Sequence, residues 1–181
     1  MGRDKLSLEV DGVPLIQRVR DALTDRCQEV LVVGDDGLRL EGVRHATGER
    51  PGKLGPLAGM EAGLACARYP LAFVAAGDMP FLHENLVDYL LGRLGRGGLL
   101  AVAPRYRGKI HPLCAAYDSD ILPHIRAALD GSVRAVHRFL EGMDGVEYVG
   151  EELWRFGDPD LLLMNVNSPG DLERARREAR R

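Results

Sequence analysis

Residues 71–80 read LAFVAAGDMP, and this stretch decides the fold class. Its first six residues form a continuous apolar run, which is typical of a short strand buried on both faces of a parallel sheet. Gly77 and Pro80 end the run and place the carboxylate of Asp78 directly after the strand. The carboxyl ends of parallel strands border the crevice in which open α/β sheets bind ligands. The stretch therefore predicts an α/β fold, with Asp78 either at a ligand-binding edge or in an ordinary turn and helix cap.

Apolar runs and helical periodicity alternate on both sides of this stretch. Further strands are predicted at 29–34, 99–103, 113–117, 146–149 and 161–166, and helices from 14 to about 24–26 and at 56–69, 83–94, 121–129, 133–140 and 169–180. This alternation favours a Rossmann-like fold, in which a mostly parallel sheet carries helices on both faces. The short separation between strands 99–103 and 113–117 indicates a hairpin or an antiparallel strand. Residues 6–10 are the candidate for a first strand, unless that strand lies upstream.

The composition bounds the class of protein. The chain has 181 residues, 45% of them hydrophobic and 28% charged, which suits one globular domain over residues 1–181. Its 24 basic and 27 acidic residues give a net charge of −3, so the composition lacks the excess of basic residues that is typical of nucleic-acid-binding proteins. No apolar run reaches the roughly 20 residues of a membrane helix, and the start lacks the apolar core of a secretory signal. Cys27, Cys66 and Cys114 form no C-x-x-C motif, which favours a reducing, cytoplasmic location.

A glycine and a proline open the second predicted helix. Gly55 and Pro56 are followed by Leu57, Ala58 and Gly59. Glycine allows close backbone approach, and the free N–H groups at the amino end of a helix can receive a phosphate or a base edge. Ordinary helix initiation explains the same residues, and the local pattern favours that simpler interpretation.

Two asparagines alternate around Val166 before the last predicted helix. Ser168 and Pro169 are a good N-cap and first residue for that helix. Capping does not account for Asn165 and Asn167, whose amides project to one side of an extended segment. These amides are available to a polar ligand or to a metal-bound water.

His111 precedes Pro112 and a predicted strand. A lone histidine is more often a hydrogen-bonded structural residue than a catalyst, and the other histidines are scattered without metal-ligand spacing. Arg134 follows a predicted turn, where it either meets an anion or faces solvent.

In their order along the chain, these motifs resemble the molybdenum cofactor guanylyltransferases, the MobA family. The resemblance rests on 1–5 (MGRDK), 55–59 (GPLAG), 77–80 (GDMP), 111–113 (HPL) and 165–169 (NVNSP), and it runs over nearly the whole chain. The last motif favours this branch over the related cytidylyltransferases, which tend to carry acidic residues there. The resemblance implies a Rossmann-like nucleotidyltransferase fold.

The resemblance also implies a reaction and its residues. The enzyme would transfer GMP from GTP to molybdopterin, forming molybdopterin guanine dinucleotide and pyrophosphate. Lys5 and Asp78 would be catalytic, with Asp78 holding Mg²⁺ and Lys5 reaching the triphosphate. The residues implied for the nucleotide are Lys5, Leu57, Ala58, Gly59 and Asp78, and those for the acceptor are His111, Asn165 and Asn167. Molybdoenzymes or other proteins of cofactor biosynthesis are the expected protein partners.

Two departures from the family pattern set further expectations. The family's glycine-rich nucleotide loop, Leu-Ala-Gly-Gly-x-Ser-x-Arg-Met-Gly, has only its last two residues here, as Met1 and Gly2. We therefore expect the rest of the loop, and the central strand before it, to lie upstream. Segment 48–53 (GERPGK) offers Glu49 but no aspartate, and its glycine spacing does not fit a Walker A loop.

Two other functions stay open at this point. One is a related transferase that uses CTP, and the other is a degenerate relative that binds the cofactor without catalysis. The missing glycine loop is the feature that favours the second of these.

Overall fold

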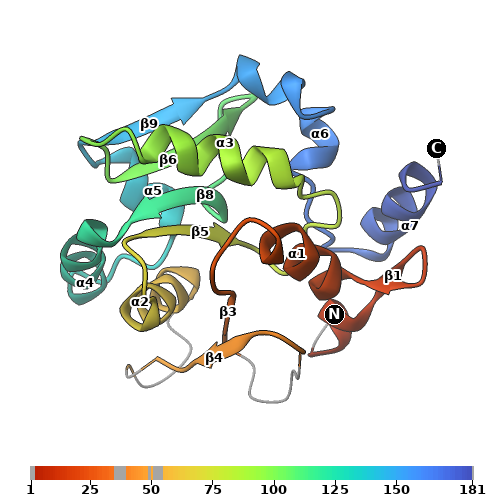
Figure 1. Cartoon of the computed structure of the whole chain (residues 1–181), viewed down its shortest axis with the longest axis horizontal. Helices are drawn as coiled ribbons and strands as arrows, with labels where there is room; N and C mark the ends of the chain where they lie inside the picture. Colours follow the sequence, from red (N-terminus) through yellow and green to blue (C-terminus); the bar gives the residue numbers. More distant parts are fainter. Residues whose placement is uncertain (1–2, 35–39, 49, 51–54, 181) are drawn as a thin grey trace.

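The computed structural model describes residues 3–34, 40–48, 50 and 55–180, whose helices and strands are shown in Figure 1. The strands are β1 (Glu9–Val10), β2 (Val13–Pro14), β3 (Leu31–Val33), β4 (Arg44–Ala46), β5 (Leu71–Ala75), β6 (Ala101–Tyr106), β7 (Lys109–Ile110), β8 (Cys114–Asp118) and β9 (Val146–Val149). The α-helices are α1 (Leu15–Thr24), α2 (Pro56–Cys66), α3 (Glu84–Leu94), α4 (Leu122–Asp130), α5 (Val136–Glu141), α6 (Pro159–Leu162) and α7 (Pro169–Glu178). The 3-10 helices are η1 (Arg3–Ser7), η2 (Ser119–Ile121) and η3 (Glu151–Arg155).

The main sheet has five strands. Four of them follow the order β5-β8-β6-β7, and β9 pairs with β6 on the edge opposite β8. Strand β8 runs antiparallel to both β5 and β6, whereas β9 runs parallel to β6. The α/β class is confirmed: β5, β6 and β9 point the same way, and β8 lies between β5 and β6 as an antiparallel strand. A parallel neighbour needs a crossover of about a dozen residues or more, and the short connection through β7 does not supply one. The antiparallel strand indicated by that short connection is confirmed.

The strands bury alternate residues in two separate cores. Val102, Cys114 and Ala116 pack with the apolar face of α3. Ala103 and Ala115 point the other way and pack with α2, α4 and α5. This alternation follows from the two-residue period of a strand. Helices therefore cover both faces, as predicted, and Figure 1 shows α3 on one side of the sheet and α2 and α4 on the other.

A small hairpin, rather than a central strand, occupies the amino-terminal segment. Strands β1 and β2 pair antiparallel across Asp11 and Gly12, which both have positive φ angles (52° and 73°). An Asp-Gly pair in this conformation closes a two-residue hairpin. Leu6 lies in η1 instead of a strand. The interpretation of residues 6–10 as the first strand of the sheet is therefore wrong.

A gap separates the small parallel pair β3–β4 from β5. A cavity of about 630 Å³ touches every residue of 30–33 and of 71–75. Successive side chains of a strand point to opposite faces, so a cavity that touches all of them lies along the strand edges. Strand β5 is only half-buried throughout, whereas the first four residues of β8 are buried. Within the described residues, no strand pairs with these edges of β3 and β5.

The predicted strand at 161–166 is wrong. Asp158 caps a short helix by accepting a hydrogen bond from the backbone N–H of Asp160, and Pro159 begins that helix, α6. An apolar run of this length does not by itself separate a strand from a buried helix, and the Asp-Pro start decides here. The chain then extends to Val166, whose backbone N–H donates to the carbonyl of Asp78 at 3.0 Å.

The remaining elements follow the predictions closely. Helix α5 begins at Val136 rather than at 133, and β4 is a strand that the sequence pattern did not reveal. Segment 48–53 lies mostly outside the described residues, and so does Glu49. Among the helices that the structure describes, none is long and apolar enough to cross a membrane.

Candidate active site

Asp78 lies three residues beyond β5, at the end of the sheet where the strand leaves the core. Asp78 is 9% exposed, and among the residues that the structure describes it is the one charged residue that is buried. The backbone N–H of Ala76 donates to the carbonyl of Leu113 at 2.8 Å, and the Asp78 carbonyl accepts from Val166 at 3.0 Å. Two segments distant in sequence thus fix the main chain around Asp78. The carboxylate lies at the strand end, as the sequence predicted.

Two polar side chains contact the Asp78 carboxylate, and a third joins the group through Lys5. Lys5 forms an ion pair with Asp78 Oδ2. The Asn165 amide nitrogen donates to Asp78 Oδ1 at 2.6 Å. Lys5 Nζ also donates to Asn167 Oδ1 at 2.7 Å. We call Lys5, Asp78, Asn165 and Asn167 the Asp78 cluster. Four residues that were predicted separately are therefore in one hydrogen-bonded group.

The two asparagines are held in place by the start of α7. Ser168 and Asp171 form a capping box, in which the Ser168 side chain accepts from the backbone N–H of Asp171. Asp171 Oδ2 accepts from the backbone N–H groups of Asn167 at 3.0 Å and Ser168 at 2.8 Å. The hydrogen bonds from Ser168 and from these backbone groups lower the pKa of Asp171. Val166 is fully buried between the asparagines, so their amides lie on the same side, Asn165 against Asp78 and Asn167 against Lys5.

The donor set of the Asp78 cluster fits a hard divalent cation. The Asp78 carboxylate and the Asn167 amide oxygen are ligands that Mg²⁺ accepts, and this ion commonly takes its other ligands from water and substrate phosphates. Among the described residues, no group of three or more His, Cys, Asp or Glu side chains could hold a metal unaided. Both carboxylate oxygens of Asp78 have protein partners. A cation that binds Asp78 must therefore displace Lys5 or share the carboxylate with it.

A second cavity, of about 450 Å³, opens beside the cluster. His111, Met79 and Asn165 all contribute to its lining. Burial, together with the charge of Lys109, lowers the pKa of His111 to about 4. His111 is therefore neutral at pH 7, with one ring nitrogen as a hydrogen-bond donor and the other as an acceptor. His111 and Asn165, both predicted to bind the acceptor, share this cavity.

The amino end of α2 lies between the two cavities. Pro56 contributes to the lining of both, and Gly59 to the larger one. Gly55 has a φ of +81°, and a Cβ there would lie 3.5 Å from the carbonyl oxygen of Arg134. Leu57 is fully buried in the core, main chain and side chain alike. Contact of Leu57, Ala58 and Gly59 with a base stays a prediction.

The smaller cavity contains basic residues that sequence reasoning did not select. Lys109, Arg134 and His137 belong to its lining. The sequence left open whether Arg134 meets an anion. Lys109 is on β7, two residues before His111. This closeness in sequence to His111 was the one feature from which a role for Lys109 could have been predicted.

The hydroxyl of Tyr117 supports the turn that carries His111. It donates to the carbonyl of Pro112 at 2.6 Å, and the side chain is fully buried. The change Tyr117→Phe should lower the free energy of unfolding by about 1 kcal/mol, because the hydrogen bond to the Pro112 carbonyl is lost. Urea unfolding monitored by circular dichroism measures this. Tyr148→Phe, which removes a 3.1 Å bond from a less buried tyrosine, is the control and should cost less. Equal stability of Tyr117→Phe and the unchanged chain would contradict the structural role.

Comparison with known proteins supports one family. A profile of the MobA-like NTP transferase domain matches residues 1–146. A probable molybdenum cofactor guanylyltransferase of Pelotomaculum thermopropionicum is 34% identical over 180 residues, covering 97% of this chain and 85% of that protein. A molybdenum cofactor guanylyltransferase of Desulfosudis oleivorans is 29% identical over 179 residues, covering 96% and 86%.

Solved structures agree with this comparison. The crystal structure of molybdopterin-guanine dinucleotide biosynthesis protein A from Archaeoglobus fulgidus has a TM-score of 0.82 and 26% identity, covering 99% of this chain and 92% of that one. The 2-C-methyl-D-erythritol 4-phosphate cytidylyltransferase of Thermus thermophilus has a TM-score of 0.74 at 20% identity, covering 98% and 94%, and it shares the fold.

Proposed function

Because this chain belongs to the MobA-like NTP transferase family, we propose that it transfers GMP from GTP to molybdopterin and releases pyrophosphate. The observation that carries the proposal is the Asp78 cluster beside a cavity, in which Lys5 and Asn165 contact one carboxylate and Asn167 accepts from Lys5. This arrangement supplies a cationic side chain for a triphosphate, oxygen ligands for Mg²⁺ and a place for a second substrate. The product would be molybdopterin guanine dinucleotide.

The proposed chemistry needs no nucleophile from the protein. A terminal phosphate oxygen of molybdopterin forms a bond to the α-phosphorus of GTP, while the bond from that phosphorus to the bridging oxygen of the β-phosphate breaks. Pyrophosphate leaves with the bonding electron pair. Positioning and charge stabilisation then determine the rate.

Each member of the Asp78 cluster has a role in this scheme. Lys5 places a positive charge against the phosphates. Asp78 and the amide oxygen of Asn167 would hold Mg²⁺, which when bound neutralises the charge that develops on the phosphate oxygens, while the Asn165 amide nitrogen orients the Asp78 carboxylate. The nucleotide would lie against the amino end of α2, and the acceptor in the cavity lined by His111 and Asn165.

The location and partners are also part of the proposal. Cys27, Cys66 and Cys114 are free thiols, which suits the reducing cytoplasm. Molybdoenzymes or other proteins of cofactor biosynthesis would receive the product.

Calorimetric titration with GTP and with CTP, each with Mg²⁺, tests the proposal. Binding of GTP in preference to CTP, followed by pyrophosphate release once molybdopterin is added, is the expected result. Binding of CTP in preference to GTP would indicate instead a related transferase that uses CTP as the nucleotide donor. Binding of neither nucleotide would overturn the proposal and favour a non-catalytic relative.

Lys5 should compete with a divalent cation for Asp78 when no nucleotide is present. Two unit charges about 4 Å apart interact by about 4 kcal/mol at an effective dielectric constant near 20, so removing one cation has a large effect on the other. The variant Lys5→Met should bind Mn²⁺, used as a paramagnetic substitute for Mg²⁺, at least about tenfold more tightly in the absence of GTP. It should also bind GTP more weakly. Electron paramagnetic resonance counts the free Mn²⁺.

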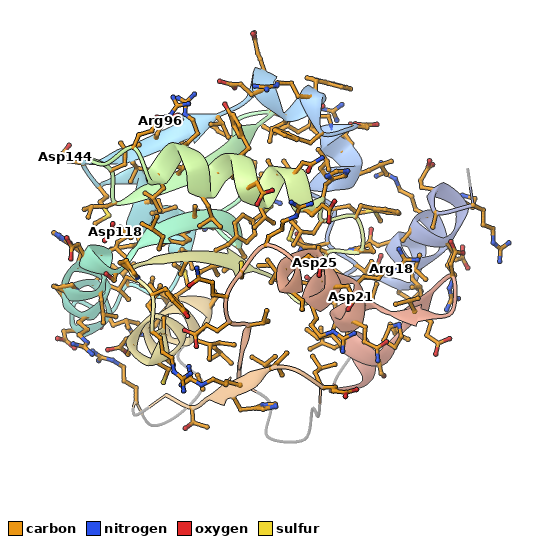
Figure 2. All side chains as sticks on the ribbon, in the orientation of Figure 1. Arg18, Asp21, Asp25, Arg96, Asp118 and Asp144 are labelled. Atoms are coloured by element: carbon orange, nitrogen blue, oxygen red, sulfur yellow. The ribbon has the colours of Figure 1, made fainter. Side chains whose placement is uncertain are left out.

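The matched control for this charge removal is Arg96→Met. Arg96 is exposed just beyond α3 and is labelled in Figure 2. Its loss should leave the Mn²⁺ affinity unchanged. Equal Mn²⁺ affinity of Lys5→Met and the unchanged chain would contradict a metal role for Asp78.

A further inference from the structure

Lys5 is carried by a small amino-terminal unit rather than by the main sheet. It lies in η1, a 3-10 helix of five residues, which Leu8 joins to the β1–β2 hairpin. Each strand of that hairpin has only two residues. A hairpin of this size is at best marginally stable by itself, so contacts from outside must hold it. The position of the Lys5 amine therefore depends on what fixes the hairpin.

Arg18 holds the first strand of the hairpin from α1. Its Nε and Nη2 both donate to the backbone carbonyl of Val10, at 3.1 and 2.8 Å. One turn earlier on the same helix, the backbone N–H of Leu15 donates to the carbonyl of Leu8 at 2.9 Å. Bonds from a guanidinium are stronger than those between neutral groups, and its rigid fork fixes direction as well as distance. Arg18, labelled in Figure 2, thus orients the main chain of β1 against α1.

A second arginine holds the same strand from α7. Arg176 Nε donates to the backbone carbonyl of Glu9 at 3.0 Å. Figure 1 shows β1 close to both α1 and α7. Val10 and Leu15 are fully buried, and they pack with Ala175 of α7 in one small core. The apolar contacts bring the hairpin and the two helices together, and the two arginines fix the direction of the strand between them.

The fixed strand is linked to the Lys5 amine by a short stretch of main chain. The carbonyl of Lys5 accepts from the backbone N–H of Leu8 at 3.3 Å. The Lys5 amine then pairs with Asp78 and donates to Asn167. Asn167 lies just before α7, and Arg176 is near the end of the same helix. Helix α7 therefore carries both an acceptor for the amine and a contact that holds the strand after η1.

Arg18 does not contact the Asp78 cluster itself. Its nearest carboxylate oxygen is Asp11 Oδ2, at 4.0 Å in the turn of the hairpin. Among the hydrogen bonds and ion pairs of the described residues, none joins Arg18 to a member of the Asp78 cluster. An effect of Arg18 on the cluster must therefore pass through the main chain of the hairpin.

We propose that Arg18 is a positioning residue for Lys5: by fixing the main chain of β1, it holds the Lys5 amine at Asp78, and Arg176 assists it from α7. A lysine side chain is long and flexible, so the direction of its main chain decides where the amine lies. The consequence for nucleotide binding rests on the proposed function, in which Lys5 places its charge against the triphosphate. The positioning itself is a property of the chain without any ligand.

The reaction of the Lys5 amine with acetic anhydride tests the proposal. Mass spectrometry measures its acetylation rate relative to that of Lys109, which is exposed on β7. In Arg18→Met, Lys5 should be acetylated at least about threefold faster than in the unchanged chain, because it spends less time paired with Asp78. Arg176→Met should have a smaller effect, since it removes one bond rather than two. Arg18→Lys should lie between, because it keeps the charge but loses the fork.

Arg20→Met is the matched control. Arg20 is also on α1, and its side chain is 24% exposed, as that of Arg18 is. Its Nε donates to Asp21 Oδ1 at 2.8 Å rather than to the hairpin. The relative acetylation rate of Lys5 should therefore stay unchanged. An equal rise in Arg20→Met would overturn the proposal, and so would equal rates for Arg18→Met and the unchanged chain. If circular dichroism shows that Arg18→Met does not fold, Arg18→Lys decides by the same measurement.

Titration with GTP and Mg²⁺ separates positioning from a general loss of structure. Arg18→Met should weaken GTP binding at least about threefold, but it should have no further effect in the Lys5→Met background, where there is no amine to position. An equal loss in both backgrounds would show a merely structural effect and would overturn the proposal. If the unchanged chain does not bind GTP, the proposed function fails, whereas the acetylation rates still decide whether Arg18 positions Lys5.

Discussion

Replacing Asp78 by asparagine is expected to lower the rate of nucleotidyl transfer by about a thousandfold, the largest effect of any single change. The change keeps the size of the side chain but removes the negative charge that Lys5 pairs with and that a divalent cation requires. Release of pyrophosphate from GTP in the presence of molybdopterin measures the rate. Calorimetry should also show that Mg²⁺ no longer strengthens GTP binding.

Asp118→Asn is the control for this experiment. Asp118 ends β8 and pairs in register with Leu71, the first residue of β5, whereas Asp78 follows the last. Figure 2 places Asp118 beside α4. Asparagine retains the cap that Asp118 provides for the backbone N–H of Asp120. The control should therefore have normal activity. Retention of more than a tenth of the rate in Asp78→Asn would contradict the assigned role.

Filling the gap between β3 and β5 is expected to give the largest gain in stability. An apolar strand of five or six residues, joined upstream of Met1 by a flexible loop, should raise the unfolding temperature by about 5–10 °C. The cavity of about 630 Å³ is lined along both strand edges and includes Leu6, near the start of the described chain. The added strand would hydrogen-bond to the open edges and bury the half-exposed side chains of β5.

Differential scanning calorimetry of two extended chains checks this expectation. The control extension has the same length but contains only Gly and Ser, which cannot fill an apolar cavity. Equal unfolding temperatures for the two extensions would show that the gap does not accept a strand. The apolar extension should also slow hydrogen exchange of β5 amides, and the polar one should not.

Local signals predicted the parts of the fold that depend on neighbouring residues. Residues 71–80 were identified correctly as a strand followed by Asp78, because an uncharged run and a Gly-Asp-Met-Pro break leave few alternatives. The cap at Ser168 and the projection of Asn165 and Asn167 to one side were also correct. Each of these depends on spacing within a few residues.

Predictions failed where a distant or competing interaction decides the structure. Residues 161–166 are apolar enough for a strand, but the cap at Asp158 begins a helix instead. The antiparallel direction of β8 was only partly foreseen, since it depends on which strand lies beside it. In the site, Lys5 is 73 residues from Asp78, and no sequence pattern measures the contact between them. Whether Arg134 faces an anion or solvent likewise depended on a cavity assembled by tertiary structure.

The capping box before α7 has an energetic consequence for ligand binding. Asp171 and Ser168 tie down the backbone of Asn167, and Val166 is locked in the core. The conformational entropy of this segment is therefore lost when the chain folds, and little of it remains to be lost when a substrate arrives. Two amides that would otherwise have to be ordered by the ligand are already oriented, so more of the intrinsic contact energy is available as affinity.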